Sequence, residues 1–223
     1  MKGTFIKIVM GFFFFISCSD NDTESIIPEV TTPYNSGTVT NPKTGRIWMD
    51  RNLGASNIAS SITDVSAYGS LYQWGRATDG HELRTSATTN SVSNTATPGH
   101  SNFILGHDNW LSPQNNTLWQ GTNGTNNPCP TGFRIPTETE WKAEMESWTS
   151  NDATGAFASV LKLSIGGARS RMSGAIGNIG TFVGYRSSTL SGLESRVLGI
   201  SLSNALIGNR ARADGNSVRC IKD

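Results

Sequence analysis

The sequence predicts an α+β protein made of small antiparallel sheets, one principal helix and long loops. Gly (24 residues) and Pro (8 residues) are frequent in the 223-residue chain, and only 16% of its residues are charged. This composition is typical of a turn-rich globular chain with more strand and loop than helix. A capped amphipathic helix is indicated near residue 140, and short alternating segments follow residue 157. A chain of this length can bury one sizeable core, or at most two small ones.

The first residues have the features of an exported lipoprotein. Lys2 and Lys7 lie near the N-terminus, and an apolar run over residues 8–16 follows them. This run is too short to span a bilayer and fits the central part of a signal peptide. The residues before Cys18 resemble a bacterial lipobox, so we expect a signal peptide over residues 1–17 and lipid on Cys18. An ordinary secretory signal with an unrelated cysteine is the alternative.

The residues after Cys18 predict the cellular location of the protein. Asp20 and Asp22 resemble the acidic export signal of Bacteroidetes lipoproteins, which implies the outer membrane with the domain facing the cell exterior. An acidic tether that serves solubility alone is the alternative. Residues 18–36 are polar, contain two prolines and have no periodicity, so we expect a flexible tether there. The folded domain is predicted over residues 37–223.

The charge balance argues against a nucleic-acid partner. The chain has 18 Lys and Arg against 17 Asp and Glu, which becomes 16 against 17 when Lys2 and Lys7 are removed with the signal peptide. No run of basic residues provides a local electrostatic footprint for phosphates.

The domain is predicted to begin with a hairpin and to contain a single principal helix. Residues 39–49 favour a hairpin because Pro42 and Gly45 supply turn geometry. Residues 79–127 are predicted to be a long polar loop, pinned by its few apolar side chains. Thr137 followed by Glu140 forms a capping box, and the apolar spacing predicts a helix that ends near residue 150. Strands are then expected over residues 159–167, 181–189, 196–203 and 216–223.

The cysteine count indicates a pair within the domain. If Cys18 carries lipid, Cys129 and Cys220 remain, 91 positions apart. In an exported, oxidising setting such a pair is more often a disulfide than a metal site or a redox motif.

Several segments together resemble one known family. The stretches "RIWMDRNLGA", "YGSLYQWGR", "CPTGFRIPTETEW", "GYRSST" and "NSVRCIKD" occur in the order of the motifs of the Fibrobacter succinogenes major paralogous domain. The resemblance covers residues 37–223 and implies a C-type lectin-like fold with a disulfide between Cys129 and Cys220. It also implies that the sheet and loops near the C-terminus form the recognition face. Arg186 departs from the family, which often has a bulky apolar residue there, so Arg186 either changes the packing or contacts a ligand.

The resemblance implies a cell-surface domain that binds an extracellular glycan or protein without catalysis. Aromatic, Arg and polar side chains of the terminal sheet are the candidate contacts, because such side chains give large contact areas and directional donors. Plain surface exposure is the alternative for this set. The predicted ligand-binding residues are Tyr185, Arg186, Ser188, Arg196, Asn204, Asn209, Arg210 and Arg212. A structural or adhesive subunit, such as a fimbrial tip component, is a second hypothesis.

No catalytic residue, metal ligand or cofactor is predicted. Enzymes of the related formylglycine-generating group use reactive thiols, and none is left if Cys129 pairs with Cys220. The fragment His107-Asp108 has no second carboxylate at a confirming spacing, so we expect a surface loop there. Calcium is kept as an alternative, but the dispersed acidic residues do not nominate the six to eight oxygen ligands that it needs.

Overall fold

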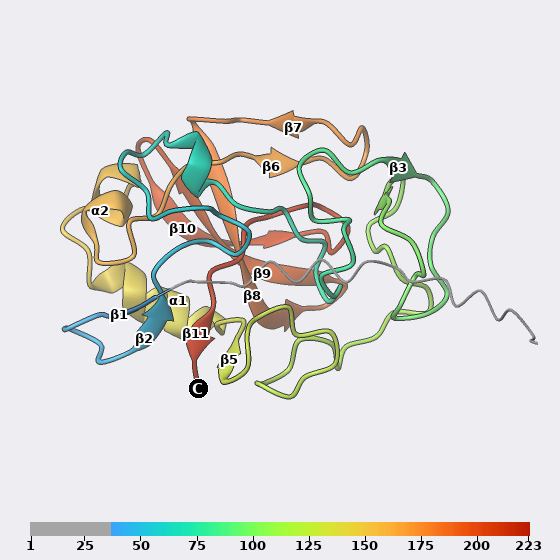
Figure 1. Ribbon diagram of the computed structural model, residues 1–223, viewed down its shortest axis with the longest axis horizontal. Helices are drawn as coiled ribbons and strands as arrows, with labels where there is room; N and C mark the ends of the chain where they lie inside the picture. The colour runs from blue at the N-terminus through green and yellow to red at the C-terminus, as the bar shows by residue number, and fades with distance from the viewer. Residues whose placement is uncertain (1–36) are drawn as a thin grey trace, which may run out of the picture. The chain divides into compact units, whose positions relative to one another are not determined.

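The two ends of the described chain, residues 37–223, meet in one small sheet (Figure 1). In this computed structural model, β1 (Thr38–Thr40) and β2 (Ile47–Met49) form the predicted hairpin. The last strand, β11 (Ile221–Lys222), lies between β2 and β5 (Phe133–Arg134) and is antiparallel to both. The predicted signal peptide, the Cys18 lipidation site and the tether over 18–36 lie outside the described residues.

A second antiparallel sheet forms the centre of the domain. It has the order β10-β9-β8 and contains β8 (Phe182–Ser191), β9 (Glu194–Ser201) and β10 (Ala205–Arg210). The first two strands were predicted. The third was not, because Gly208 and the exposed Leu206 obscure the alternation that marks a strand. The protein is therefore a mixed α+β domain with mostly small antiparallel sheets, as predicted.

Two predicted strands are wrong in whole or in part. Residues 159–167 do not form a strand, although Leu161, Leu163 and Ile165 alternate in the sequence and are buried. Lys162 has a φ of 49°, which breaks the extended conformation. The strand predicted over 216–223 is reduced to β11, because residues 216–219 instead make single bridges and side-chain contacts.

The principal helix, α1 (Glu138–Glu146), begins as predicted. The Thr137 side chain accepts from the Glu140 N–H, and the Glu140 side chain accepts from the Thr137 N–H. The helix ends at Glu146 with Ser147 as its C-cap, earlier than predicted. A second helix, α2 (Ala153–Ala158), was missed, and a 3₁₀ turn, η1 (Val65–Ala67), lies in the first half of the domain.

Neither helix of residues 37–223 has both the length and the hydropathy that crossing a bilayer requires.

The long polar segment between residues 79 and 127 has little regular structure. Its short strands β3 (Thr88–Thr89) and β4 (Phe103–Ile104) pair in parallel. Trp110 and Trp119 are fully buried and donate their indole N–H groups to the carbonyls of Trp74 and Arg76. The predicted pinning of this segment by apolar side chains is confirmed. A further hairpin, β6 (Ala168–Arg169) with β7 (Ile176–Gly177), precedes β8.

The apolar core lies in two clusters. The first fills the space between the helices and the β10-β9-β8 sheet, and its Trp48 and Trp141 rings lie 4.9 Å apart. The second lies among the loops and the C-terminal segment, around Trp74, Trp110 and Trp119. Both clusters depend on chain segments that are distant in sequence, so the loops are part of the packed structure.

The structure contains the expected disulfide between Cys129 and Cys220. The Cα atoms of the two residues are 5.9 Å apart, and Cys220 is fully buried in the second core cluster. The bond links the chain before β5 to the residue before β11, across 91 positions.

Removal of this bond should destabilise the domain strongly. For the double variant Cys129→Ser, Cys220→Ser we expect the free energy of unfolding to fall by about 4 kcal/mol, because the unfolded chain regains the entropy of a long open loop. Urea unfolding followed by Trp fluorescence measures this change. Reduction of the wild-type protein should give the same midpoint as the double variant, and an unchanged midpoint in both cases would contradict the prediction.

Candidate functional site

Two adjoining hollows lie on the face of the β10-β9-β8 sheet that is turned away from α1. The opposite face carries Tyr185 and Leu198, which belong to the core cluster that contains Trp141 of α1. Side chains alternate between the two faces of a strand. The face away from the helix therefore presents Phe182 and Gly184 from β8, with residues such as Gly199 from β9 and Leu206 from β10.

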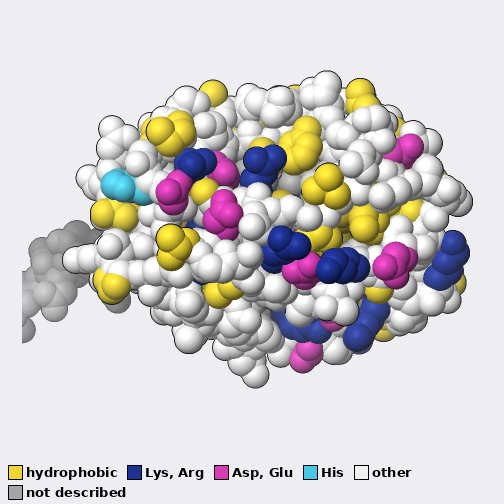
Figure 2. All heavy atoms as spheres, turned by 180° about the vertical axis from the view of Figure 1, so that it is seen from behind, with side chains coloured by type: hydrophobic (Ala, Val, Ile, Leu, Met, Phe, Trp, Pro, Cys, Tyr) yellow, Lys and Arg dark blue, Asp and Glu magenta, His cyan; other side chains and the backbone are white. Residues whose placement is uncertain are grey.

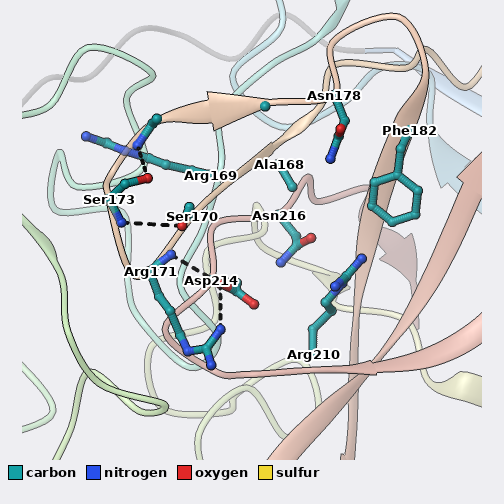
Figure 3. A pocket seen from close by; sticks show the side chains of 12 residues that line it. Ala168, Arg169, Ser170, Arg171, Ser173, Asn178, Phe182, Arg210, Asp214 and Asn216 are labelled. Carbon is teal, nitrogen blue, oxygen red and sulfur yellow. Dashed lines mark hydrogen bonds and ion pairs between the residues drawn. The ribbon is translucent and has the colours of Figure 1, made fainter.

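The first hollow is polar and has a volume of about 360 Å³. Its walls are the β6–β7 hairpin, the start of β8, the end of β10 and the segment that follows β10 (Figure 3). The side chains that give it chemical character are Arg169, Arg171, Asn178, Phe182, Arg210, Asp214 and Asn216.

One wall is formed by a cation–π pair between Arg210 and Phe182. The guanidinium carbon of Arg210 lies 5.1 Å from the centre of the Phe182 ring, and the two side chains face one another across the hollow's edge (Figure 3). Arg210 is exposed, and within residues 37–223 no acidic side chain forms an ion pair with it. The Phe182 ring in turn covers Gly199, where an added Cβ would come within 3.2 Å of the ring. Arg210 is therefore held at the edge by the ring alone.

The floor of the hollow is a buried amide. The Asn216 side chain is closed to solvent, and no atom of residues 37–223 forms a hydrogen bond with its Nδ2 or its Oδ1. Its backbone is fixed, because Asn216 exchanges hydrogen bonds with Tyr72. Gly184 leaves room for the amide, since a Cβ at this position would collide with Asn216 Oδ1. An amide with unsatisfied donors and acceptors is costly in a protein interior, so this group needs a physical explanation.

The other two arginines of the hollow are fixed in place. Arg171 pairs with Asp108 at 2.8 Å and with Asp214 at 3.5 Å. Arg169 is 4% exposed, and its guanidinium lies over the Phe103 ring. It donates hydrogen bonds to the carbonyls of Leu83, Ser86 and Gly174. No acidic side chain of residues 37–223 pairs with Arg169. Three arginines and one aspartate line the hollow, so its local charge is positive.

The second hollow is shallower and more apolar, with a volume of about 270 Å³. It shares Phe182 and Arg210 with the first and extends across the sheet to Leu206, which is 51% exposed. Gly199 and Gly208 lie within it and leave the sheet surface without side chains. Together the two hollows form one depression with Phe182 and Arg210 at its centre.

One face of the molecule carries both signs of charge. On the face in Figure 2, Lys and Arg side chains lie beside Asp and Glu side chains, with hydrophobic side chains scattered between them. This face shows no extended basic patch.

Four of the eight predicted ligand-binding residues lie at or near the surface. Arg210 belongs to both hollows, and Asn204 and Asn209 line the second. Arg196 lies on the helix side of the sheet, where it pairs with both carboxylate oxygens of Glu138 at 2.9 and 3.1 Å and donates to Asn209 Oδ1. The Arg196 side chain is therefore bound to Glu138 of α1 and does not face the hollows.

Tyr185 and Ser188 are not surface contacts. Tyr185 is fully buried, and its hydroxyl donates to the Ser164 carbonyl and accepts from the Asn52 amide. Ser188 is buried beside the start of α1, where its N–H donates to the Pro136 carbonyl. Both residues serve the scaffold.

Arg186 and Arg212 are also buried, which corrects their predicted role. The Arg186 guanidinium donates to Ser195 Oγ at 2.7 Å and to the carbonyls of Ala211, Arg212 and Asp214. Burial lowers the pKa of Arg186 to about 9. Arg212 lies over the Trp74 ring and donates to the carbonyls of two loops. Arg186 is therefore a buried packing residue in this structure.

The remaining site residues carry little signal in the sequence. Phe182 could have been found, because its position in the predicted strand places it opposite Tyr185 in the alternation. Arg171, Asn178, Asp214 and Asn216 come from turns and irregular segments, and no periodic signal identifies them.

A cluster of potential metal ligands is already satisfied by protein contacts. Asp79, His81 and Glu82 have ligating atoms within 4.8 Å of one another, the one such group found in residues 37–223. His81 is fully buried, against the expectation of a surface loop around the histidines. Its Nε2 accepts from the Gln73 N–H, so Nδ1 carries the proton and donates to Asp79 at 2.7 Å. Arg76 also pairs with Asp79 at 2.7 Å. His81 and Asp79 are therefore both engaged by protein groups and are not free to coordinate an ion.

The buried imidazole should make stability depend on pH. Burial lowers the pKa of His81 to about 4, against the opposing effect of the Asp79 hydrogen bond. The unfolded chain binds a proton at His81 below about pH 6.5, while the folded protein does not until about pH 4. We therefore expect the free energy of unfolding to fall by on the order of 3 kcal/mol as the pH is lowered from about 6.5 to about 4.

The variant His81→Gln isolates this contribution. Urea unfolding between pH 4 and pH 7 should show a weaker pH dependence for His81→Gln than for the wild-type protein. His107→Gln is the matched control, because His107 contacts the Asn90 carbonyl at the surface, and it should keep the wild-type dependence. An equal dependence in wild type and His81→Gln would show that His81 is not the responsible group.

Comparisons with known proteins assign no family to the chain. Protein-family models, curated proteins and solved structures each gave no significant match. Function must therefore be argued from the residues of the two hollows and their surroundings.

Proposed function

We propose that this chain is a cell-surface lipoprotein whose C-type lectin-like domain binds an extracellular glycan or protein ligand without catalysis. The ligand would lie in the depression centred on Phe182 and Arg210. The small antiparallel sheets, the single principal helix and the Cys129–Cys220 disulfide are the features expected of that fold. The lipid anchor and the outer-membrane location rest on the sequence around Cys18.

The observation that carries the proposal is the unsatisfied amide beneath an unpaired arginine. Asn216 has a donor and an acceptor without protein partners, and Arg210 has no ion pair within the described domain. Binding sites typically combine an apolar surface with a few convergent polar groups. Phe182 supplies the apolar surface here, and the walls of the hollow are fixed by the contacts of Arg169 and Arg186. Fixed walls lower the ordering cost of binding.

The cysteine chemistry weighs against an enzyme of the formylglycine-generating group. Both cysteines of residues 37–223 are joined in the disulfide, so neither offers a thiolate as nucleophile or ligand. The polar groups of the hollow are amides, guanidinium groups, serine hydroxyls and the Asp214 carboxylate, which Arg171 engages. A binding role needs only hydrogen bonds and charge from these groups, without a nucleophile.

A structural or adhesive subunit is the second candidate, and an unpaired strand edge favours it. β10 is the outer strand of the β10-β9-β8 sheet. The outward backbone groups of Ala205 are capped by Asn151, and alternation directs those of Ile207 and Asn209 away from β9 as well. Strand addition by a partner would use this edge. Co-purification with pilus proteins, lost on an Ile207→Pro change, would favour this candidate over the first.

Ligand binding should depend on Arg210. We expect the purified full-length protein to bind members of a glycan array or a cell surface, and Arg210→Ala to lower the affinity at least tenfold because an exposed, unpaired cation is removed from the site. Glycan arrays followed by biolayer interferometry measure the change.

The control is Arg196→Ala, on the opposite face of the same sheet. It removes the pair with Glu138 and the hydrogen bond to Asn209 Oδ1 and leaves the polar hollow intact, so its affinity should match that of the wild-type protein. Binding that is insensitive to Arg210→Ala would place the recognition face elsewhere.

A further inference from the structure

We infer that the polar hollow takes the anionic group and adjacent hydroxyls of an acidic saccharide. This inference rests on the proposed function and specifies the chemical class of its ligand. It follows from the charge of the hollow, the state of the Asn216 amide and the geometry of the Arg210–Phe182 pair.

The charge of the hollow favours an anion. Arg169, Arg171 and Arg210 line the hollow together with Asp214, which is its single lining carboxylate. Asp214 and Asp108 are both engaged by Arg171, and no acidic side chain pairs with the other two lining arginines within the described domain. A carboxylate or sulfate would accept charge-assisted, bidentate hydrogen bonds from Arg210, whose planar guanidinium suits such groups.

The amides of the hollow favour hydroxyl groups beside that anion. Asn216 and Asn178 both direct their side chains toward the hollow (Figure 3). Each amide offers two N–H donors and one carbonyl acceptor, and a sugar hydroxyl can donate to the oxygen and accept from the nitrogen. An inorganic anion such as sulfate accepts only, so it would leave Asn216 Oδ1 without a partner. The Asn216 amide is therefore explained by a ligand that carries both kinds of group.

The size and the aromatic wall fit one sugar unit. The volume of about 360 Å³ lies at the lower end of the range for small-molecule sites. The Phe182 ring presents an apolar face on which the C–H groups of a sugar can lie. Within residues 37–223 the Arg210 guanidinium forms no ion pair and rests on that ring, so it can turn toward an anionic group in the hollow.

Matched acidic and neutral saccharides test the inference. Binding of the full-length protein would be measured by isothermal titration with oligosaccharides that contain galacturonate, glucuronate or N-acetylneuraminate, and with the methyl ester of each. The ester removes the charge and leaves the hydroxyls in place. We expect at least one acid to bind at least tenfold more tightly than its ester, and this preference to weaken as salt is raised.

Variants assign the preference to the hollow. Arg210→Ala should lower the affinity for the acid to that of the ester and leave the affinity for the ester unchanged. Asn178→Ala should weaken acid and ester alike, because it removes contacts with hydroxyls. Arg196→Ala is the control and should change neither affinity.

Three outcomes would overturn the inference. The first is equal affinity for every acid and its ester, which would leave a neutral glycan ligand under the proposed function. The second is inorganic sulfate or phosphate binding as tightly as the best acid, which would show an anion site only. The third is an acid preference that survives Arg210→Ala. Failure of the proposed function itself would differ from all three, since no glycan or cell surface would then bind.

Discussion

Buried arginines that bind backbone carbonyls are the interaction on which this structure depends. The domain has long segments without helices or ladders, and their carbonyl groups need partners. Arg186 and Arg219 are fully buried and each donates to carbonyls from separate segments, Arg219 to those of Met49 and Leu161. Arg76, Arg169 and Arg212 do the same in the long loops. Each guanidinium supplies five donors, and hydrogen bonds from charged donors contribute about 1.5–3 kcal/mol each.

The same interactions build the candidate site. The segment after β10 has no ladder of its own, and Arg186 holds it from beneath through the carbonyls of Ala211, Arg212 and Asp214. Arg169 holds the turn of the β6–β7 hairpin through the Gly174 carbonyl. These two segments are walls of the polar hollow, and Asn216 belongs to the first of them. The guanidinium groups of Arg169 and Arg186 thus hold the walls of the hollow, and within residues 37–223 Arg210 is a lining arginine without an ion pair.

The sequence predicted the regular parts of this fold well, because their signals are local. Thr137 with Glu140 marks the start of α1, and the alternation through Tyr185 and Leu198 marks β8 and β9. The disulfide followed from the cysteine count and the family resemblance. β10 was not predicted because Gly208 and Leu206 obscure its alternation. Residues 159–167 were wrongly predicted as a strand, because alternating apolar residues can be buried without forming a ladder.

The site was harder to predict for a physical reason. Arginine has the same sequence signature whether it lies on the surface or satisfies buried carbonyls, so Arg186 and Arg212 could not be told apart from Arg210. The partners that decide between these roles come from distant segments, as in the bridge between Tyr72 and Asn216. Three of the predicted contacts, Asn204, Asn209 and Arg210, line the depression, and its floor was not foreseen.

Native-state amide hydrogen exchange tests most directly whether buried arginines fix the walls of the site. The N–H groups of Gly215, Asn216 and Ser217 donate to carbonyls of three other segments, and the adjoining Arg186 is fully buried. If Arg186 locks this segment, these amides exchange with the same free energy of opening as those at the centre of β8, and Arg186→Met lowers theirs selectively. Exchange of these amides in the wild-type protein through a local opening several kcal/mol below that of β8 would contradict the account.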